Sequence, residues 1–178
     1  MSREEVYERP IDRLNQQHAA AVYRRVLQEQ FGASVSVQMF PTLSRVDAVF
    51  TVYAQMPFSV VAEVKARWLQ NKHTKQPYPN YQIDKGKIDY LLDFSKRERA
   101  RCMARLIVWR MDRGDLWVCR PSQYAEGWST GPMKRNAPRP GIGYRDNPTT
   151  TAYIIPWRHG QAVAEVPPRD TDEQGWIQ

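Results

Sequence analysis

The stretch VVAEVKAR, residues 60–67, decides how the rest of the chain is interpreted. Its Val and Ala residues predict a buried strand, but Glu63 and Lys65 interrupt the apolar run. Because residues i and i+2 of a strand face the same way, the carboxylate and the ammonium project together while Val64 points to the other side. Buried charges are costly unless they are paired or bind a ligand. These two side chains are therefore candidates for a functional site.

A second carboxylate stands in an equally apolar setting. Asp47 lies in the preceding run RVDAVFTVYA, and a hairpin between the two runs would bring it toward Glu63 on the neighbouring strand. Two carboxylates held close repel each other, and a hard divalent cation such as Mg2+ relieves that repulsion through oxygen ligands. The Val64 carbonyl is a further candidate ligand. Lys65 would then lie near the metal, where its ammonium orients or deprotonates a water or stabilises charge on a phosphate.

Apolar periodicity before this point predicts one helix and a strand meander. Apolar residues from Ala19 to Leu27 repeat at helical spacing and Gly32 follows them, which predicts a helix over about residues 12–31. Three runs rich in Val and Phe then predict successive antiparallel strands. These strands cover residues 35–40, 45–54 and 58–67.

Beyond the meander the pattern alternates between loops and regular elements. Residues 69–81 predict a loop, and apolar spacing from Ile83 to Phe94 predicts a second helix that begins at Gln82 and ends near Lys96. Two further strands are expected on either side of the Asp-Arg-Gly turn, followed by a last strand in which Pro156 marks an edge or an end. These three strands cover residues 104–111, 115–120 and 151–157.

The same pattern suggests one domain with a tail. Residues 1–158 are expected to form a single domain with its core over about residues 12–119. Residues 126–148, dense in Gly, Pro and cations, predict a long basic surface loop. Residues 159–178, Pro-rich and acidic, predict a C-terminal tail.

Composition places the chain among soluble globular proteins. The 178 residues are 42% hydrophobic, which suffices for one domain with a substantial core. No apolar run approaches the ~20 residues that cross a bilayer, and the polar N-terminal segment lacks the features of a signal peptide. Cys102 and Cys119 show no metal-binding spacing, so reduced cysteines are expected. We therefore expect no membrane partner and a cytoplasmic location.

Basic residues are concentrated in the middle of the chain. The net charge is −1 over residues 1–64, +11 over residues 65–145 and −3 over residues 146–178. This pattern favours a polyanionic partner such as nucleic acid, since phosphate contacts release counterions and supply affinity that does not depend on sequence. A solvated surface that only keeps the protein soluble is the alternative.

Asp47, fifteen intervening residues and then Glu63-Val64-Lys65, placed after a helix and on adjacent strands, resemble the PD-(D/E)XK nuclease superfamily. That superfamily includes restriction endonucleases, Holliday-junction resolvases and phage nucleases. The resemblance implies an α/β fold with a restriction endonuclease-like core, in which a central mixed β-sheet of α-β-β-β-α-β order is flanked by helices. One departure is Val46, which stands where many members have Pro.

The resemblance also implies an activity. It implies hydrolysis of phosphodiester bonds in DNA with Mg2+, or alternatively Mn2+, as cofactor. Asp47 and Glu63 would be metal ligands and Lys65 the catalytic ammonium. Two cuts need two sites, so a homodimer is one expected assembly, and a phage-encoded chain would act in the host cytoplasm. The alternatives are a DNA-binding protein whose catalysis has lapsed, a basic interaction protein, and a structural ion pair at Lys65.

Two more positions are expected at this site. Many members carry an acidic residue on the first helix. Here Gln16, Gln17 and His18 are expected near the inward end of that helix, and Gln17 is the preferred equivalent, whereas Glu8 or Glu29 would need a different geometry. The run YQIDKGKIDYLLDF looks like the segment after the catalytic strand in phage-type members, where a Lys or Gln faces the site. Lys87 would then bring a second positive charge to the scissile phosphate. Alternatively, it is a lysine whose stem packs on the helix face.

Candidate DNA contacts come from the basic segments. Interleaved cations and aromatic residues suit phosphate contact and base stacking, and solvated loops are the alternative. The residues expected to contact DNA are Arg67, Lys72, Lys75, Tyr81, Lys85, Lys134 and Arg135.

Overall fold

A computed structural model describes residues 10–41, 44–71, 73–98, 101–134 and 149–168 of the chain. Its helices are α1 (Pro10–Phe31), α2 (Lys85–Arg97) and α3 (Pro121–Tyr124), with 3-10 turns η1 (Ala125–Gly127) and η3 (Trp157–His159). Its strands are β1 (Val35–Met39), β2 (Ala48–Val52), β3 (Phe58–Arg67), β4 (Asn80–Asp84), β5 (Cys102–Arg110), β6 (Asp115–Cys119), β7 (Ser129–Lys134), β8 (Thr149–Pro156) and β9 (Gly160–Glu165). None of the helices in these ranges is both long and apolar enough to cross a membrane.

The first helix and the meander are confirmed. Helix α1 ends before Gly32, whose φ of 57° is the left-handed conformation that commonly stops a helix. Strands β1, β2 and β3 then pair in antiparallel order, with Val35 opposite Val52 and Ala48 opposite Ala62. Alternate residues of β2 are buried, which is the period-two pattern that predicted it.

A mixed sheet forms because the chain crosses over after β3. Helix α2 carries the chain back to β5, which pairs in parallel with β3, and β6 and β9 complete the order β1-β2-β3-β5-β6-β9. The protein therefore has a mixed sheet with helices, as expected for the α/β class. The tight turn between β5 and β6 is also confirmed, with Gly114 at φ 65°.

Helix α2 begins later than predicted. It starts at Lys85 rather than Gln82, because the Asp84 carboxylate accepts a hydrogen bond from the Gly86 amide and caps the helix there. Residues Asn80–Asp84 instead form β4, in which Tyr81 and Ile83 are buried and Gln82 is exposed. That alternation is a strand signal that helical spacing concealed.

Two of the C-terminal predictions need correction. Strand β7 occupies part of the expected basic loop and pairs with β8, the central strand of a second sheet of order β4-β8-β7. Pro156 ends β8, as one of its two predicted placements required. The expected tail is wrong over residues 160–165, since β9 pairs with β6 there. Val166 follows as a buried residue whose carbonyl accepts a hydrogen bond from Trp109 Nε1 at 2.8 Å, so the folded domain extends past residue 158.

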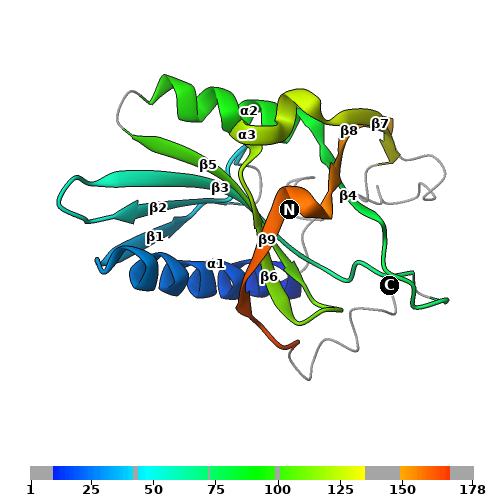
Figure 1. Ribbon diagram of the computed structural model, residues 1–178, viewed down its shortest axis with the longest axis horizontal. Coiled ribbons are helices and arrows are strands. Elements are labelled where there is room, and N and C mark those ends of the chain that lie inside the picture. Colours follow the sequence, from blue (N-terminus) through cyan, green and yellow to red (C-terminus); the bar gives the residue numbers. More distant parts are fainter. Residues whose placement is uncertain (1–9, 42–43, 72, 99–100, 135–148, 169–178) are drawn as a thin grey trace.

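The six-stranded sheet lies between α1 and α2 (Figure 1), and an apolar cluster lies on each of its faces. Helix α1 covers one face, where Val64 packs in the same cluster as Tyr23 and Trp109. Helix α2 covers the other face, where Leu91 packs with Val61. Because side chains of β3 alternate between the two layers, the residues flanking Val64 face α2.

Candidate active site

The polar side chains of β3 converge with Asp47 on the α2 face. The Asp47 amide donates to the Ala62 carbonyl at 3.1 Å, so Asp47 and Ala48 both lie against Ala62, the two-to-one pattern of a β-bulge at the start of β2. The side chains of Asp47 and Glu63 reach the same place, because Lys65 Nζ contacts both carboxylates. The hairpin predicted from the sequence thus brings the two carboxylates together.

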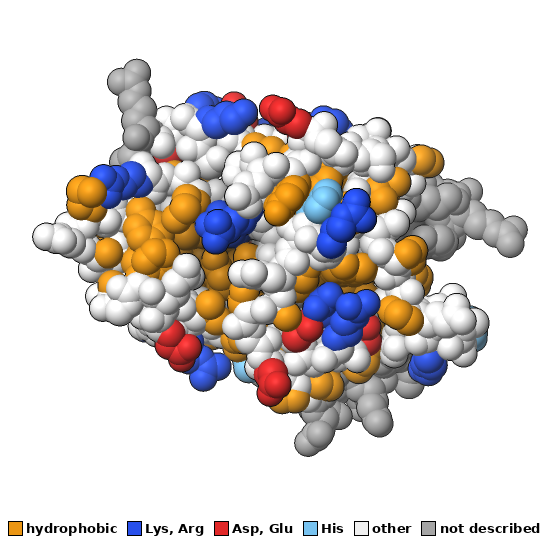
Figure 2. Space-filling view, viewed as in Figure 1, with side chains coloured by type: hydrophobic (Ala, Val, Ile, Leu, Met, Phe, Trp, Pro, Cys, Tyr) orange, Lys and Arg blue, Asp and Glu red, His pale blue; other side chains and the backbone are white. Residues whose placement is uncertain are grey.

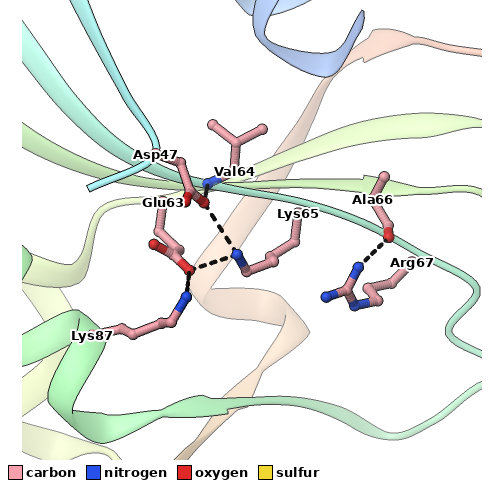
Figure 3. Close-up of polar contacts among 7 residues, drawn as sticks. All are labelled: Asp47, Glu63, Val64, Lys65, Ala66, Arg67 and Lys87. Atoms are coloured by element: carbon pink, nitrogen blue, oxygen red, sulfur yellow. Dashed lines mark hydrogen bonds and ion pairs between the residues drawn. The ribbon is translucent and has the colours of Figure 1, made fainter. Parts of the chain in front are cut away.

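Two lysines join the two acids (Figure 3). Lys65 Nζ lies 2.7 Å from Glu63 Oε1 and 3.1 Å from Asp47 Oδ2. Lys87 Nζ, from the first turn of α2, lies 2.8 Å from the same Glu63 oxygen. We call Asp47, Glu63, Lys65 and Lys87 the acid–lysine cluster. Lys87 thus faces the carboxylates, as one of its two interpretations required.

The acid–lysine cluster is buried except at one corner. Glu63 is 1% exposed, and Asp47 and Lys65 are also buried, whereas 43% of the Lys87 side chain is exposed. The Val64 amide donates to Asp47 Oδ2 at 2.8 Å and fixes that carboxylate. Two carboxylates and two ammonium groups give the cluster a net charge of zero, which is how buried charges become tolerable.

Burial and ion pairing shift the pKa values in different directions. Burial raises the pKa of Asp47, and the attraction of Lys65 only partly opposes it. Burial also acts to raise the pKa of Glu63, but the ammonium groups of Lys65 and Lys87 outweigh it, so that pKa is lowered. For Lys65, burial acts to lower the pKa, yet the Glu63 and Asp47 carboxylates raise it above its ordinary value. Glu63 is therefore ionised and Lys65 protonated at neutral pH.

The donor set suits a magnesium ion with few protein ligands. The contacts above engage Asp47 Oδ2 and Glu63 Oε1, and the second oxygen of each carboxylate takes part in none of them. A residue's amide and carbonyl lie at the same edge of a strand, so the Val64 carbonyl points toward the β2 side with its amide. Among the described residues no group of three or more His, Cys, Asp and Glu side chains could hold a metal. Mg2+ typically uses only one or two carboxylates together with waters and substrate phosphates, so these residues fit it.

The structure does not bring Gln17 to the acid–lysine cluster. Gln17 is exposed, on the helix that covers the opposite face of the sheet. The inward positions of α1 at this end are Asn15 and Gln16, which are both 5% exposed. Glu29 is exposed near the end of the same helix, and Glu8 lies outside the described residues.

The predicted DNA contacts have different outcomes. Arg67 is exposed beyond Lys65 on β3, where its guanidinium donates to the Ala66 carbonyl (Figure 3). Stacking by Tyr81 is wrong, since this ring is buried against Trp157 with centroids 5.8 Å apart. Burial also raises the pKa of its phenol.

The remaining predicted contacts lie in α2 and in the loops. Lys85 pairs with Asp89 on its own helix and lies over the Tyr153 ring, while Lys75 is exposed. Lys134 ends β7, and Lys72 and Arg135 lie outside the described residues. In the view of Figure 2, the Lys and Arg side chains of the described residues are scattered over the face rather than gathered in one patch.

A pocket near the cluster was not predicted from the sequence. A pocket of about 260 Å³ opens between the end of the β1–β2 connection and α2. It is lined by Phe40, Ser44, Arg45, Val46, Val49, Tyr90 and Phe94. The available signal was the i, i+4 spacing of Tyr90 and Phe94, which was used only to predict a buried helix face.

Comparison of the chain with protein-family models, with curated proteins and with solved structures finds no match. Function is therefore inferred from the geometry of the acid–lysine cluster and from the resemblance of its residue pattern. The homodimer and the cytoplasmic location stay predictions.

Proposed function

We propose that the protein is a Mg2+-dependent nuclease that hydrolyses phosphodiester bonds of DNA on a restriction endonuclease-like core. The observation that carries the proposal is the convergence of Asp47 and Glu63, from neighbouring strands, around the ammonium of Lys65. This is the constellation that the resemblance to the PD-(D/E)XK superfamily implies. The order of α1, β1, β2, β3, α2 and β5 also agrees with that core, with β4 inserted before α2.

The two carboxylates of the cluster form a cation site, and in the structure the Lys65 ammonium occupies it. Lys65 Nζ bridges Asp47 Oδ2 and Glu63 Oε1, so a positive charge is stabilised between the two carboxylates. Asp47, Glu63 and the Val64 carbonyl would hold Mg2+. When bound, Mg2+ polarises a phosphate oxygen and lowers the pKa of a bound water.

The lysines have separate parts in the proposed reaction. Because its pKa is raised, Lys65 keeps its protons at neutral pH and acts as a hydrogen-bond donor. Its ammonium orients the attacking water and stabilises charge that develops on the phosphate. Lys87 is the more exposed of the two, so it is placed to meet the incoming phosphate. Both lysines favour a polyanionic substrate at this face.

A structural ion-pair network is the second candidate, and one observation favours it. Each charged member of the acid–lysine cluster already has an oppositely charged partner inside the protein. A fold can retain such a network without using it for chemistry. The two candidates differ in whether the cluster is needed for cleavage.

Cleavage assays with matched variants separate them. The purified protein is incubated with linear, circular and four-way-junction DNA in the presence of Mg2+, Mn2+ or a chelator. We expect metal-dependent cleavage that Asp47→Asn and Lys65→Ala each reduce by about 100-fold or more, the range for removal of one group that stabilises charge in the transition state. DNA affinity should be largely retained. Lys96→Ala, at an exposed position in the last turn of α2, is the control and should cleave like the wild type. Equal cleavage by Asp47→Asn and the wild type would reject the assignment.

A further inference from the structure

We infer that the pocket between the β1–β2 connection and α2 binds one unpaired nucleobase of the substrate strand, next to the scissile phosphate. The inference rests on the proposed nuclease function and extends it to the class of substrate. We call this cavity the base pocket; its lining residues are those given above.

The base pocket adjoins the acid–lysine cluster through two of its walls. Val46 lines the pocket and precedes Asp47 in the chain, so one peptide unit of about 3.8 Å separates their Cα atoms. On α2, Tyr90 follows Lys87 at i+3, a spacing that leaves about 5–6 Å between Cβ atoms. Two elements that build the cluster therefore build the pocket as well.

Packed apolar side chains connect the base pocket with the acid–lysine cluster. Val49 lines the pocket and pairs across the sheet with Val61. Val61 lies two residues before Glu63, so both side chains face α2. Leu91 of α2 packs in the same buried cluster as Val61. The pocket and the acid–lysine cluster thus occupy neighbouring positions on the face of the sheet that α2 covers.

The chemistry of the walls suits a planar heteroaromatic ring. Tyr90 and Phe94 lie with ring centroids 6.3 Å apart, and the Arg45 guanidinium lies over the Tyr90 ring, 5.1 Å from its centroid. Unpaired bases stack on aromatic rings and on guanidinium planes. The Ser44 hydroxyl adds one group that can donate or accept a hydrogen bond.

Charge favours a nucleotide over other planar or apolar ligands. None of the described residues that line the pocket is Asp or Glu, so none of these side chains repels a phosphate. The Arg97 guanidinium lies 5.9 Å from the centroid of the same Tyr90 ring and pairs with Asp93 on its own helix. Lys87 lies one turn away toward the cluster. A phosphate attached to the bound base would therefore meet cations on either side.

The size of the pocket suits a single ring system. A volume of about 260 Å³ is smaller than the pockets of about 300 Å³ and more that enclose drug-sized ligands. A base can enter only when it is unstacked and unpaired, and unpairing costs least in single-stranded or frayed DNA. The protein should therefore prefer single strands, flaps or splayed ends over continuous duplex.

The inference is tested by binding in a chelator, where cleavage plays no part. The probe is a single-stranded oligonucleotide that carries 2-aminopurine, compared with the same strand in which that position is abasic. We expect the wild type to quench the 2-aminopurine fluorescence and to bind the abasic strand more weakly. Tyr90→Ala should bind the base-containing strand about 5-fold to about 150-fold more weakly, as when one base–aromatic stack is removed, and Tyr90→Phe should retain binding.

Two further variants keep the test informative. Arg45→Ala removes an exposed guanidinium and should weaken the same binding even if Tyr90→Ala fails to fold. Tyr53→Ala removes an exposed ring from the β2–β3 turn and should bind like the wild type. Equal wild-type affinity for the base-containing and abasic strands, or no effect of Arg45→Ala, would overturn the inference. Metal-dependent cleavage without base preference would leave the nuclease proposal standing alone, whereas base-dependent binding without any cleavage would support the base pocket and contradict the nuclease.

Discussion

Replacing Lys65 by Met tests whether the ammonium holds two buried acids together. Lys65 is 9% exposed and contacts both Glu63 and Asp47, so the substitution removes a charge from the interior at similar side-chain length. Glu63 keeps Lys87 Nζ at 2.8 Å, whereas Asp47 keeps the Val64 amide. One buried carboxylate, rather than two, is left without a cation. We therefore expect the low end of the range for a broken buried pair, a loss of about 3 kcal/mol in the free energy of unfolding.

The size of this loss should depend on pH. The pKa of Asp47 is raised in the folded protein, and it should rise further when Lys65 is absent. A carboxyl group with a raised folded pKa stabilises the protein below its unfolded pKa, and the contribution disappears as the pH rises through the folded pKa. The difference in the free energy of unfolding between Lys65→Met and the wild type should therefore become smaller as the pH is lowered.

Mg2+ should restore part of the lost stability. Without Lys65, the cluster carries a net charge of −1 and two carboxylates that a divalent ion can share. At a Mg2+ concentration of 100 times Kd, binding to the folded state adds about 2.7 kcal/mol. Urea unfolding followed by tryptophan fluorescence, in chelator and in Mg2+, measures both effects, with Lys96→Met as the control. The reasoning fails if Lys65→Met unfolds at the wild-type urea concentration in chelator, or if Mg2+ stabilises it no more than the wild type.

Two further predictions concern the stability of the fold at low pH and the packing of strand β9 against β6. Because the pKa of Glu63 is lowered from its ordinary value of 4.5, its ionisation stabilises the fold above that pH and the contribution is lost as the pH falls through the folded pKa. Glu63→Gln should flatten the loss of stability below about pH 4.5 in urea titrations, and an unchanged pH profile would contradict the ion-pair assignment. Gly160→Ala would place a Cβ 2.3 Å from the Trp117 ring, so overpacking should cost about 3 kcal/mol in thermal unfolding; a wild-type melting temperature would show that β9 is not held against β6 there.

Local patterns predicted the elements whose partners are adjacent in the chain. The meander of β1, β2 and β3 was predictable because each strand pairs with the next and alternates clearly. The second sheet was not, since β4 pairs with a strand about 70 residues later and leads directly into α2. Strand β9 has a weakly alternating pattern, and its partner β6 lies about 45 residues earlier. In β4 the short alternation was masked by the helical spacing that follows it, and in β9 the alternation was too weak to predict a strand.

The same reasoning explains the outcome at the site. Asp47, Glu63 and Lys65 were predictable together because strand alternation and one hairpin fix their common face. The prediction that Gln17 faces the site was wrong, although the helical spacing contained the answer. The positions three and four residues before the buried Ala19 are Gln16 and Asn15, so Gln17 does not lie on the buried face of α1. The base pocket could not be predicted, because it depends on how α2 is set against the start of β2 after the crossover.

Charge compensation links folding, metal and substrate at this site. The acid–lysine cluster is neutral by itself, so the fold needs no metal to tolerate its two buried carboxylates. On the proposed function, Mg2+ adds two positive charges to a buried, neutral site, and burial disfavours that excess. A phosphate of DNA brings compensating negative charge to the exposed corner at Lys87. Metal and DNA should therefore each increase the affinity for the other, so that the site binds Mg2+ most tightly when a scissile phosphate is present.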